Sequence, residues 1–175
     1  GGIEGGIFPG VQALAMFDDG SGPKLYAAGR FTQADGAAAS NIASWDGTSW
    51  SPLGSGLTGG SPTIVEALAV FDDGSGPALY AGGSFTTAGG VSAHAVARWD
   101  GTAWSATAVS ANYITYALEV FDDGSGPALY AGGAYGSVLG GVTRWDGTSW
   151  SALGGGLSTQ WNEWVFALEV FDDGS

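Results

Sequence analysis

AVFDDGSG (69–76) is one of four nearly identical stretches; the others are AMFDDGSG (15–22), EVFDDGSG (119–126) and EVFDDGS (169–175). Their phenylalanines stand at positions 17, 71, 121 and 171, so the steps along the chain are 54, 50 and 50 residues. A step of about 50 residues is typical of a repeat architecture, in which each copy forms one structural unit. The rest of the sequence is therefore interpreted against this period.

The composition is that of a folded, acidic chain. Hydrophobic residues make up 45% and aromatic residues 13% of the 175 positions, which excludes a disordered chain. Seventeen acidic against four basic side chains give a net charge of −13, which disfavours nucleic acid and anionic membranes as partners. With one histidine and no cysteine, we predict no transition-metal site and no disulfide. No apolar run reaches about 18 residues, so we predict no membrane insertion.

The second copy shows how each repeat divides into strands. Residues 67–71 are apolar and precede the turn-forming DDGSGP, and ALYAGGSF (78–85) predicts a second strand. After the small-residue loop TTAGGVSAH, residues 95–99 predict a third strand, and DGTA links it to a fourth that begins at Trp104. Glycine-rich turns at these intervals leave no window long enough for a helix. We therefore expect an all-β fold with four short strands per repeat.

A four-stranded antiparallel sheet of this size cannot bury both of its faces alone. Stacking such sheets radially around an axis, as in a β-propeller, covers both faces, and the strands here are apolar on both. We predict a β-propeller made of four-stranded antiparallel blades of about 50 residues, with three full blades plus one extra strand in this chain. The predicted units are 1–12 (end of a preceding blade and link), 13–57, 67–109 and 117–157 (blades), and 166–175 (first strand of the next blade).

The chain resembles the kelch type of propeller blade. LYAGG at 79–83 and 129–133 places a glycine doublet after an apolar strand, and spaced aromatic residues follow. The first copy has Ala28 in place of the first glycine, and pairs such as Trp45 and Trp50 are closer together than the usual kelch tyrosine and tryptophan. These pairs are also similar to the sialidase Asp-box, with a spacing one residue shorter. The resemblance implies a propeller fold without a specific subfamily.

The two ends of the predicted propeller segment do not complement each other. Residues 1–3 align with the end of a fourth strand, whereas residues 166–171 are a lone first strand. A head-to-tail partner would supply neither the second nor the third strand of the blade that begins there, and an open sheet edge invites association. We therefore expect other blades of a longer chain, or other copies of the chain, as partners.

The repeat also separates two ends of each predicted blade. In an up-and-down blade, the turns after strands one and three lie at one end, and the loops after strands two and four lie at the other. DDGSGP and DGTS recur almost unchanged at the first, which we call the invariant end. FTQADGAAAS, FTTAGGVSAH, AYGSVLGG and the links between blades differ at the second, the variable end. We expect binding at the variable end, because loops on a rigid scaffold commonly carry function.

The paired aspartates of the turns allow two interpretations. Calcium binds several carboxylate and carbonyl oxygens at one centre, but these aspartates are adjacent and lack the alternating spacing that wraps one ion. Aspartate side chains commonly cap the backbone amides of tight turns, so we predict caps without a cofactor and keep calcium as the alternative. Arg98 and Arg144 stand where the first copy has Ser44, and we expect them to stack on indole or to pair with a turn carboxylate.

The tryptophan hairpins are the third repeated feature. WDGTSW occurs twice and WDGTAW once, and Asp-Gly is a strong signal for a tight turn. A loop centred on Gly47 and the following threonine would set Trp45 and Trp50 directly opposite each other, whereas an Asp-Gly loop would offset them. We expect the rings to pack in the outer layer of the blade. The alternative is a platform on which sugars stack, which would resemble some lectin propellers.

The links between blades differ most and supply the candidate binding residues. SANYITY and STQWNEWVF combine aromatic rings with amides and a carboxylate, which suits a neutral carbohydrate or a peptide. The alternative is that the rings pack between blades or against another protein. The predicted ligand-binding residues are Asn112, Tyr113, Tyr116, Trp161, Asn162, Glu163 and Trp164.

The absence of a catalytic constellation favours a non-catalytic binding or scaffolding propeller that holds glycan or protein. We expect it to be secreted by a bacterium or carried on its surface. The alternative is a self-assembling structural repeat protein with calcium-stabilised acidic turns. A part of a secreted enzyme, with catalytic residues in further blades, is less expected. A copper site resembling that of galactose oxidase needs a cysteine, and sialidase chemistry needs an arginine cluster, neither of which this sequence contains. A carboxylate pair such as Glu163 with Glu119 could serve as acid and base.

Overall fold

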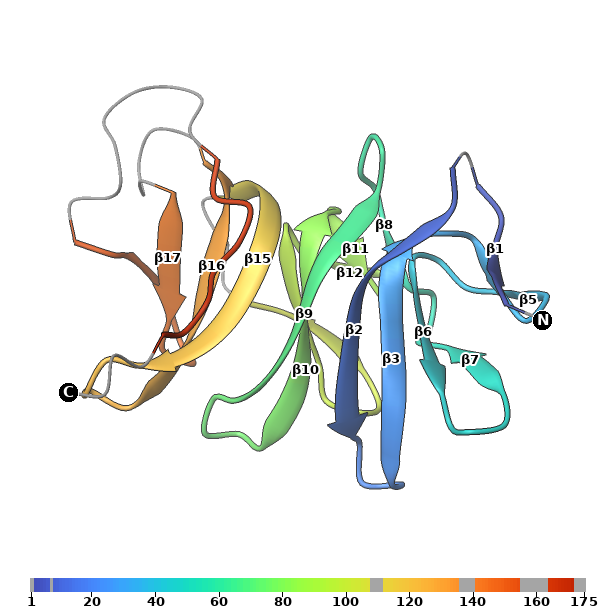
Figure 1. Ribbon diagram of the computed structural model, residues 1–175, viewed down its shortest axis with the longest axis horizontal. Helices are drawn as coiled ribbons and strands as arrows, with labels where there is room; N and C mark the ends of the chain where they lie inside the picture. The colour runs from blue at the N-terminus through green and yellow to red at the C-terminus, as the bar shows by residue number, and fades with distance from the viewer. Residues whose placement is uncertain (1, 7, 108–111, 136–140, 155–163, 172–175) are drawn as a thin grey trace.

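The computed structural model of the chain is all-β (Figure 1). It describes residues 2–6, 8–107, 112–135, 141–154 and 164–171, and no helix occurs within these ranges. A helix long and apolar enough to cross a membrane is accordingly not found in that part of the chain. The prediction of an all-β fold is confirmed.

Three four-stranded antiparallel sheets, one for each full copy of the repeat, hold the longer strands in chain order. Sheet I consists of β2 (Gly10–Asp18), β3 (Pro23–Arg30), β6 (Ile42–Trp45) and β7 (Trp50–Pro52). Sheet II consists of β9 (Ile64–Asp72), β10 (Pro77–Ser84), β13 (Val96–Trp99) and β14 (Trp104–Ala106). Sheet III consists of β15 (Asn112–Asp122), β16 (Pro127–Tyr135), β17 (Val142–Trp145) and β18 (Trp150–Ala152). The described residues form an open row of sheets and no closed ring (Figure 1).

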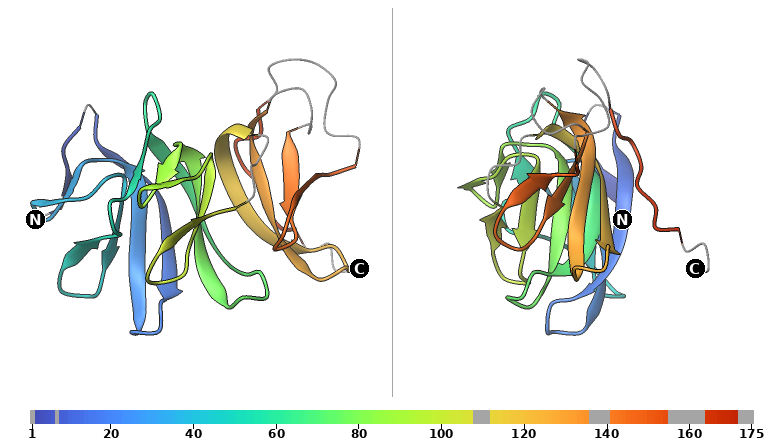
Figure 2. Two further views of the ribbon diagram at one scale, coloured as in Figure 1. Left: turned by 180° about the vertical axis from the view of Figure 1, so that it is seen from behind. Right: turned by 90° about the vertical axis from the view of Figure 1, so that its left-hand side faces the viewer.

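Neighbouring sheets bury their apolar faces against each other. Between sheets I and II, Phe17 and Tyr26 belong to the same core cluster as Leu79 and Trp99. The corresponding residues of the next two copies meet between sheets II and III. The first strands β2, β9 and β15 contact one another in turn, so the sheets stand side by side in sequence order (Figure 2). This packing explains why the strands are apolar on both faces.

Short strands that the sequence does not predict connect successive repeats at the variable end. The chain leaving sheet I forms β8 (Leu57–Thr58), which pairs with β11 (Thr87–Ala88), and β11 pairs with β12 (Val91–Ser92). In the same way, β1 (Ile3–Glu4) pairs with β4 (Gln33–Ala34), and β4 pairs with β5 (Ala37–Ala38). The segment TTAGGVSAH therefore contains a small hairpin, where a loop was expected.

The tryptophan hairpins have the four-residue loop that sets the rings opposite each other. Trp45 pairs directly with Trp50, and their ring centroids are 5.5 Å apart. The equivalent pairs in sheets II and III are each 5.3 Å apart. Trp104 is buried, and its indole N–H donates to the carbonyl oxygen of Leu53 in the preceding sheet, at 3.1 Å. The packing interpretation of these rings is supported, because they join one sheet to the next.

Residues 166–171, the described part of the predicted first strand at 166–175, form no regular strand. The backbone N–H of Val165 donates to the carbonyl oxygen of Gly133 at 3.2 Å, and Trp164 forms an isolated bridge with sheet III. The side chains of Val165 and Leu168 pack against sheet III. A regular strand needs hydrogen-bonded pairing along its length. Among the described residues, this segment pairs with sheet III only at Trp164 and Val165.

Candidate functional site

At the invariant end, each of the three described acidic turns is closed by its own side chains. Asp18 Oδ1 accepts hydrogen bonds from the backbone N–H groups of Gly20 (2.9 Å) and Gly22 (3.0 Å). Asp19 Oδ1 accepts from the N–H and the hydroxyl of Ser21. The second and third copies repeat these bonds. The capping interpretation is confirmed for these three turns, and DDGSG is constant because each polar residue in it closes the turn.

The second aspartate of the turn also ties the turn to the sheet. Asp19 Oδ2 accepts hydrogen bonds from the hydroxyl of Tyr26 (3.1 Å) and from the ammonium group of Lys24 (2.7 Å). Burial alone would raise the pKa of the Asp19 carboxyl, but the hydrogen bonds from Lys24 and Ser21 outweigh burial and hold this pKa well below its usual range. Burial and the adjacent Asp19 charge raise the pKa of Tyr26. The carboxylate is thus ionised and the phenol neutral near neutral pH.

The cation beside this aspartate changes its place between copies. The second copy has Ala78 where the first has Lys24, and its cation is Arg98 on the third strand, where the first copy has Ser44. Arg98 Nε lies 3.4 Å from Asp73 Oδ2, and the third copy repeats the arrangement. The expectation that these arginines pair with turn carboxylates is confirmed. Each of the three described turns therefore has one cation beside it, although the residue that supplies it differs.

The invariant turns of neighbouring sheets also pack on each other. A Cβ atom added at Gly101, in the hairpin of sheet II, would lie 2.8 Å from the Cβ atom of Asp19 in sheet I. A Cβ atom at Gly147, in the hairpin of sheet III, would lie 2.7 Å from the carbonyl oxygen of Asp73 in sheet II. Both glycines also have a positive φ, which favours glycine. The two repeated motifs are constant because they meet across each interface.

At the variable end, the first strand of each sheet contains a β-bulge. The register between β9 and β10 shifts so that Glu66 has no partner on β10, and Gln12 and Tyr116 are left out in the same way in sheets I and III. A Cβ atom at Gly83, across from the bulge, would lie 2.2 Å from the carbonyl oxygen of Ile64. The second glycine of the doublet is therefore required by the bulge. Bulges redirect side chains and are common beside binding sites.

The bulged residue is the one that differs most between otherwise similar first strands. VQALAMF (11–17), VEALAVF (65–71), TYALEVF (115–121) and VFALEVF (165–171) have Gln12, Glu66, Tyr116 and Phe166 at their second position. Glu66 and Tyr116 line a hollow of about 460 Å³. Its other lining residues are Gly59, Gly60, Ser61, Pro62, Ile64, Ser84, Phe85, Thr86 and Ile114. Two of the four varied side chains thus border a concave surface.

Aromatic residues from two links meet beside this hollow. The ring of Tyr116 lies 4.9 Å from that of Phe166, and Phe166 lies 5.8 Å from Trp164 in an edge-to-face arrangement. Phe166 and Trp164 are exposed. The structure therefore brings together two of the predicted binding residues, Tyr116 and Trp164, through a third ring that the sequence prediction omitted.

The other predicted binding residues cannot be placed in the same way. Asn112 and Tyr113 begin β15, with Asn112 opposite Tyr135, and their side chains lie outside the described part of the chain. Trp161, Asn162 and Glu163 lie outside the described residues. The candidate site is accordingly built from Tyr116 and its described neighbours.

Glu66 is a site residue that the sequence prediction missed. It is partly buried, and this burial raises the pKa of its carboxyl. Within the described residues, no hydrogen bond or ion pair compensates the carboxylate. Alignment of the four first strands could have indicated both Glu66 and Phe166, because the residue type at this position changes from copy to copy while alanine always follows it.

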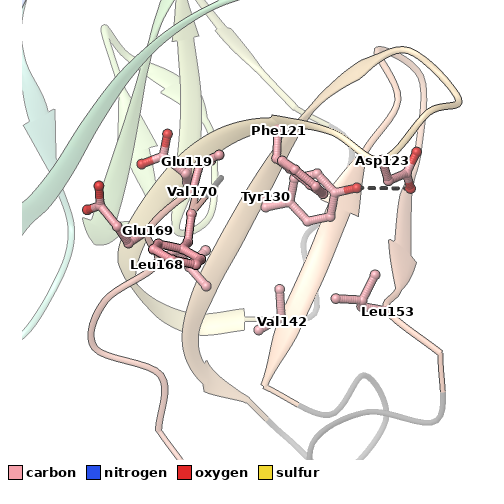
Figure 3. A pocket seen from close by; sticks show the side chains of 10 residues that line it. Glu119, Phe121, Asp123, Tyr130, Val142, Leu153, Leu168, Glu169 and Val170 are labelled. Carbon is pink, nitrogen blue, oxygen red and sulfur yellow. Dashed lines mark hydrogen bonds between the residues drawn. The ribbon is translucent and has the colours of Figure 1, made fainter. Parts of the chain in front are cut away.

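A second hollow, of about 420 Å³, lies on the face of sheet III that points away from sheet II (Figure 3). Phe121, Tyr130 and Val142 contribute from sheet III, and Leu168 and Val170 from the segment that follows. Tyr130 donates a hydrogen bond to Asp123 at its edge, at 3.2 Å. The hollow is mainly apolar and corresponds to the face that a neighbouring sheet covers at the two internal interfaces.

Comparison with known proteins supplies no relative. No family model, curated protein or solved structure matches this chain. Among the described residues, no group of three or more His, Cys, Asp or Glu side chains is placed to hold a metal ion. The features available for a functional assignment are therefore the variable-end hollow and the apolar end faces.

Proposed function

We propose that the chain is part of a kelch-like β-propeller in which the three sheets are successive blades and residues 166–171 begin a further blade. Three features support this proposal: the strands of each sheet follow chain order, the first strands lie next to one another, and each interface uses equivalent residues. In this assembly the invariant turns pack one blade on the next, and β8 also joins two blades at the variable end. The variable end is free to bind.

The proposed function is non-catalytic binding at the hollow beside Tyr116. The observation that carries it is the β-bulge, because it brings the residue that differs between copies to the lining of a concave surface. The wall of the hollow is preformed: the Ser84 hydroxyl donates to the carbonyl oxygen of Pro62 (2.8 Å), and the Thr86 hydroxyl donates to that of Gly59 (3.3 Å). A preformed wall lowers the entropic cost of binding.

A neutral glycan is the ligand that suits this site best. The volume of the hollow beside Tyr116 lies in the range of about 300–1,000 Å³ that is usual for small-ligand pockets. The Tyr116 ring can stack on the apolar face of a sugar, and the Glu66 carboxylate can accept hydrogen bonds from sugar hydroxyls. The net charge of −13 disfavours anionic ligands. We place this activity outside a bacterial cell, where such glycans are displayed.

A glycan array followed by calorimetric titration of the strongest ligand tests the proposal. Tyr116→Ala should weaken binding by about tenfold, since loss of a stacked ring costs about 1 kcal/mol or more. Tyr116→Phe, which keeps the ring, should stay within about threefold of the original affinity. Gln33→Ala, an exposed change in β4 that spares the hollow, is the matched control. Failure of every glycan to bind, or unchanged binding by Tyr116→Ala, contradicts the proposal, and capture of a protein ligand at Tyr116 would replace the glycan assignment.

A further inference from the structure

A single charged side chain, that of Glu66, lines the hollow beside Tyr116. Burial raises the pKa of its carboxyl, and within the described ranges of the chain it has no hydrogen-bond donor or cation as a partner. A partly buried carboxylate without a partner lowers stability. The bulge itself does not need the charge, because Gln12 and Tyr116 occupy the same position in sheets I and III. The carboxylate is therefore a destabilising group that the fold does not require, as is typical of functional sites.

The bulge in β9 turns Glu66 into the hollow. Side chains of a regular strand alternate between its two faces, so Glu66 would share the face of Leu68, which packs against the core between sheets I and II. The register shift between β9 and β10 gives that face to Val65, which is fully buried in the same core cluster. Glu66 is displaced from this apolar core and lines the hollow together with Ile114 and Tyr116 of β15. The backbone thus presents the carboxylate to the concave surface.

The hydroxyls that shape the wall of the hollow already have partners. The Ser84 hydroxyl donates to the carbonyl oxygen of Pro62 and accepts from the backbone N–H of the first residue of β9, at 3.1 Å. The Thr86 hydroxyl donates to the link that precedes β9. Two further hydroxyls in the lining, those of Ser61 and Tyr116, are uncharged. Among the described lining residues, the Glu66 carboxylate is thus the one charged acceptor that a ligand can meet.

We propose that Glu66 is the residue that determines which glycan the hollow takes: its carboxylate binds two neighbouring free hydroxyls of a neutral sugar whose apolar face stacks on Tyr116. This inference rests on the glycan-binding function proposed above and names the class of sugar. An ionised carboxylate has two oxygens that only accept hydrogen bonds, whereas two adjacent sugar hydroxyls can each donate one. Hydrogen bonds to a charged acceptor are about twice as strong as those between neutral groups.

The same contact rejects sugars that lack the hydroxyl pair. A deoxy sugar, or a sugar that carries a substituent on one of the two hydroxyls, leaves a carboxylate oxygen of Glu66 without a donor when the ligand covers the hollow. A site built to pair a polar group of its ligand discriminates strongly against an analogue without that group, because its own buried group is then left unpaired. The ligand class is therefore neutral sugars with two adjacent free hydroxyls.

Ligand-observed NMR titration with the methyl glycosides of glucose, galactose and mannose, and with their monodeoxy derivatives, tests the inference. At least one parent glycoside should bind the original chain, and removal of a hydroxyl should raise its dissociation constant about tenfold at two adjacent ring positions only. In Glu66→Ala, which has no carboxylate, the same deoxy derivatives should bind within about twofold of the parent. This cycle of ligand and protein changes assigns the hydroxyl pair to Glu66.

Glu66→Gln separates recognition from stability. This variant keeps the shape of the side chain and removes its charge, so it should bind the parent glycoside about tenfold more weakly. Its Tm at neutral pH should rise, because a partly buried charge is gone, so the weaker binding cannot come from unfolding. Gln12→Ala, at the equivalent bulge of sheet I and outside the hollow, is the matched control and should leave binding unchanged.

The outcomes separate this inference from the proposed function. Glycan binding that Tyr116→Ala weakens but Glu66→Gln does not, or deoxy derivatives that lose equal affinity for the original chain and for Glu66→Ala, overturns the role of Glu66 and leaves the glycan-binding function standing. Failure of all three methyl glycosides to bind overturns the inference as well, because each of them presents adjacent hydroxyls. Failure of every glycan on the array contradicts both.

Discussion

Truncation of equivalent phenylalanines should have unequal effects on stability. Phe71 is 6% exposed between sheets II and III, and Phe121 is 43% exposed on the face of sheet III that points away from sheet II. The difference of 37 percentage points corresponds to about 75 Å² of a side chain that buries about 200 Å², or about 2 kcal/mol at about 25 cal/mol per Å². Phe71→Ala should also leave a cavity and cost about 3–5 kcal/mol in total. Phe121→Ala should cost about 1–2 kcal/mol.

Urea denaturation followed by tryptophan fluorescence measures both free energies of unfolding. The slope of each titration must equal that of the original chain for the comparison to hold. Equal losses for the two variants, or a larger loss for Phe121→Ala, would refute the conclusion that the internal interfaces and the end face differ in burial.

Further expected outcomes concern the bulge, the buried carboxylate and the acidic turns. Gly83→Ala should lower the free energy of unfolding by about 2 kcal/mol or more in urea titrations, because the new Cβ atom would lie 2.2 Å from a backbone oxygen. Gly10→Ala is the control: its Cβ atom would meet nothing nearer than 3.9 Å, so the free energy of unfolding should change by about 0.5 kcal/mol at most. Glu66→Gln should raise Tm at neutral pH, and this gain should vanish as pH falls through the raised pKa of Glu66, because the folded state then carries the proton that burial favours. In the first tryptophan hairpin, hydrogen bonds from Thr48 and Ser49 lower the pKa of the Asp46 carboxyl. Tm should therefore fall as pH drops below the usual aspartate range, and it should fall by less in Asp46→Asn. Millimolar calcium should leave Tm unchanged, because the turn carboxylates already accept hydrogen bonds; a rise would restore calcium as a ligand.

The features predictable from the sequence are those that local residue chemistry determines. Apolar runs between turn-forming residues indicate the strands of each sheet, as in ALYAGGSF, and Asp-Gly indicates the hairpins. The capping role of Asp18 also follows from its neighbours, because glycine amides two and four residues later lie within its reach. Most of sheets I to III could therefore be anticipated.

The features that were missed depend on contacts between repeats. β8 and β11 are two residues long and carry no periodic pattern, so only their pairing reveals them. The bulge at Glu66 arises from the close approach of Gly83 to the neighbouring backbone, and a glycine doublet alone does not specify it. Of the candidate site, Tyr116 and Trp164 were anticipated as aromatic link residues. Glu66 was not, because it lies inside a strand that otherwise repeats.

Hydrogen–deuterium exchange with and without the strongest glycan ligand tests most directly the claim that the variable end binds and the invariant end joins sheets. The account predicts that the ligand slows exchange in residues 59–66, 84–86 and 114–116, which border the hollow, and leaves the acidic turns unchanged. Protection confined to the turns at 18–23 and 72–77 or to the tryptophan hairpins, with none at 114–116, would contradict it.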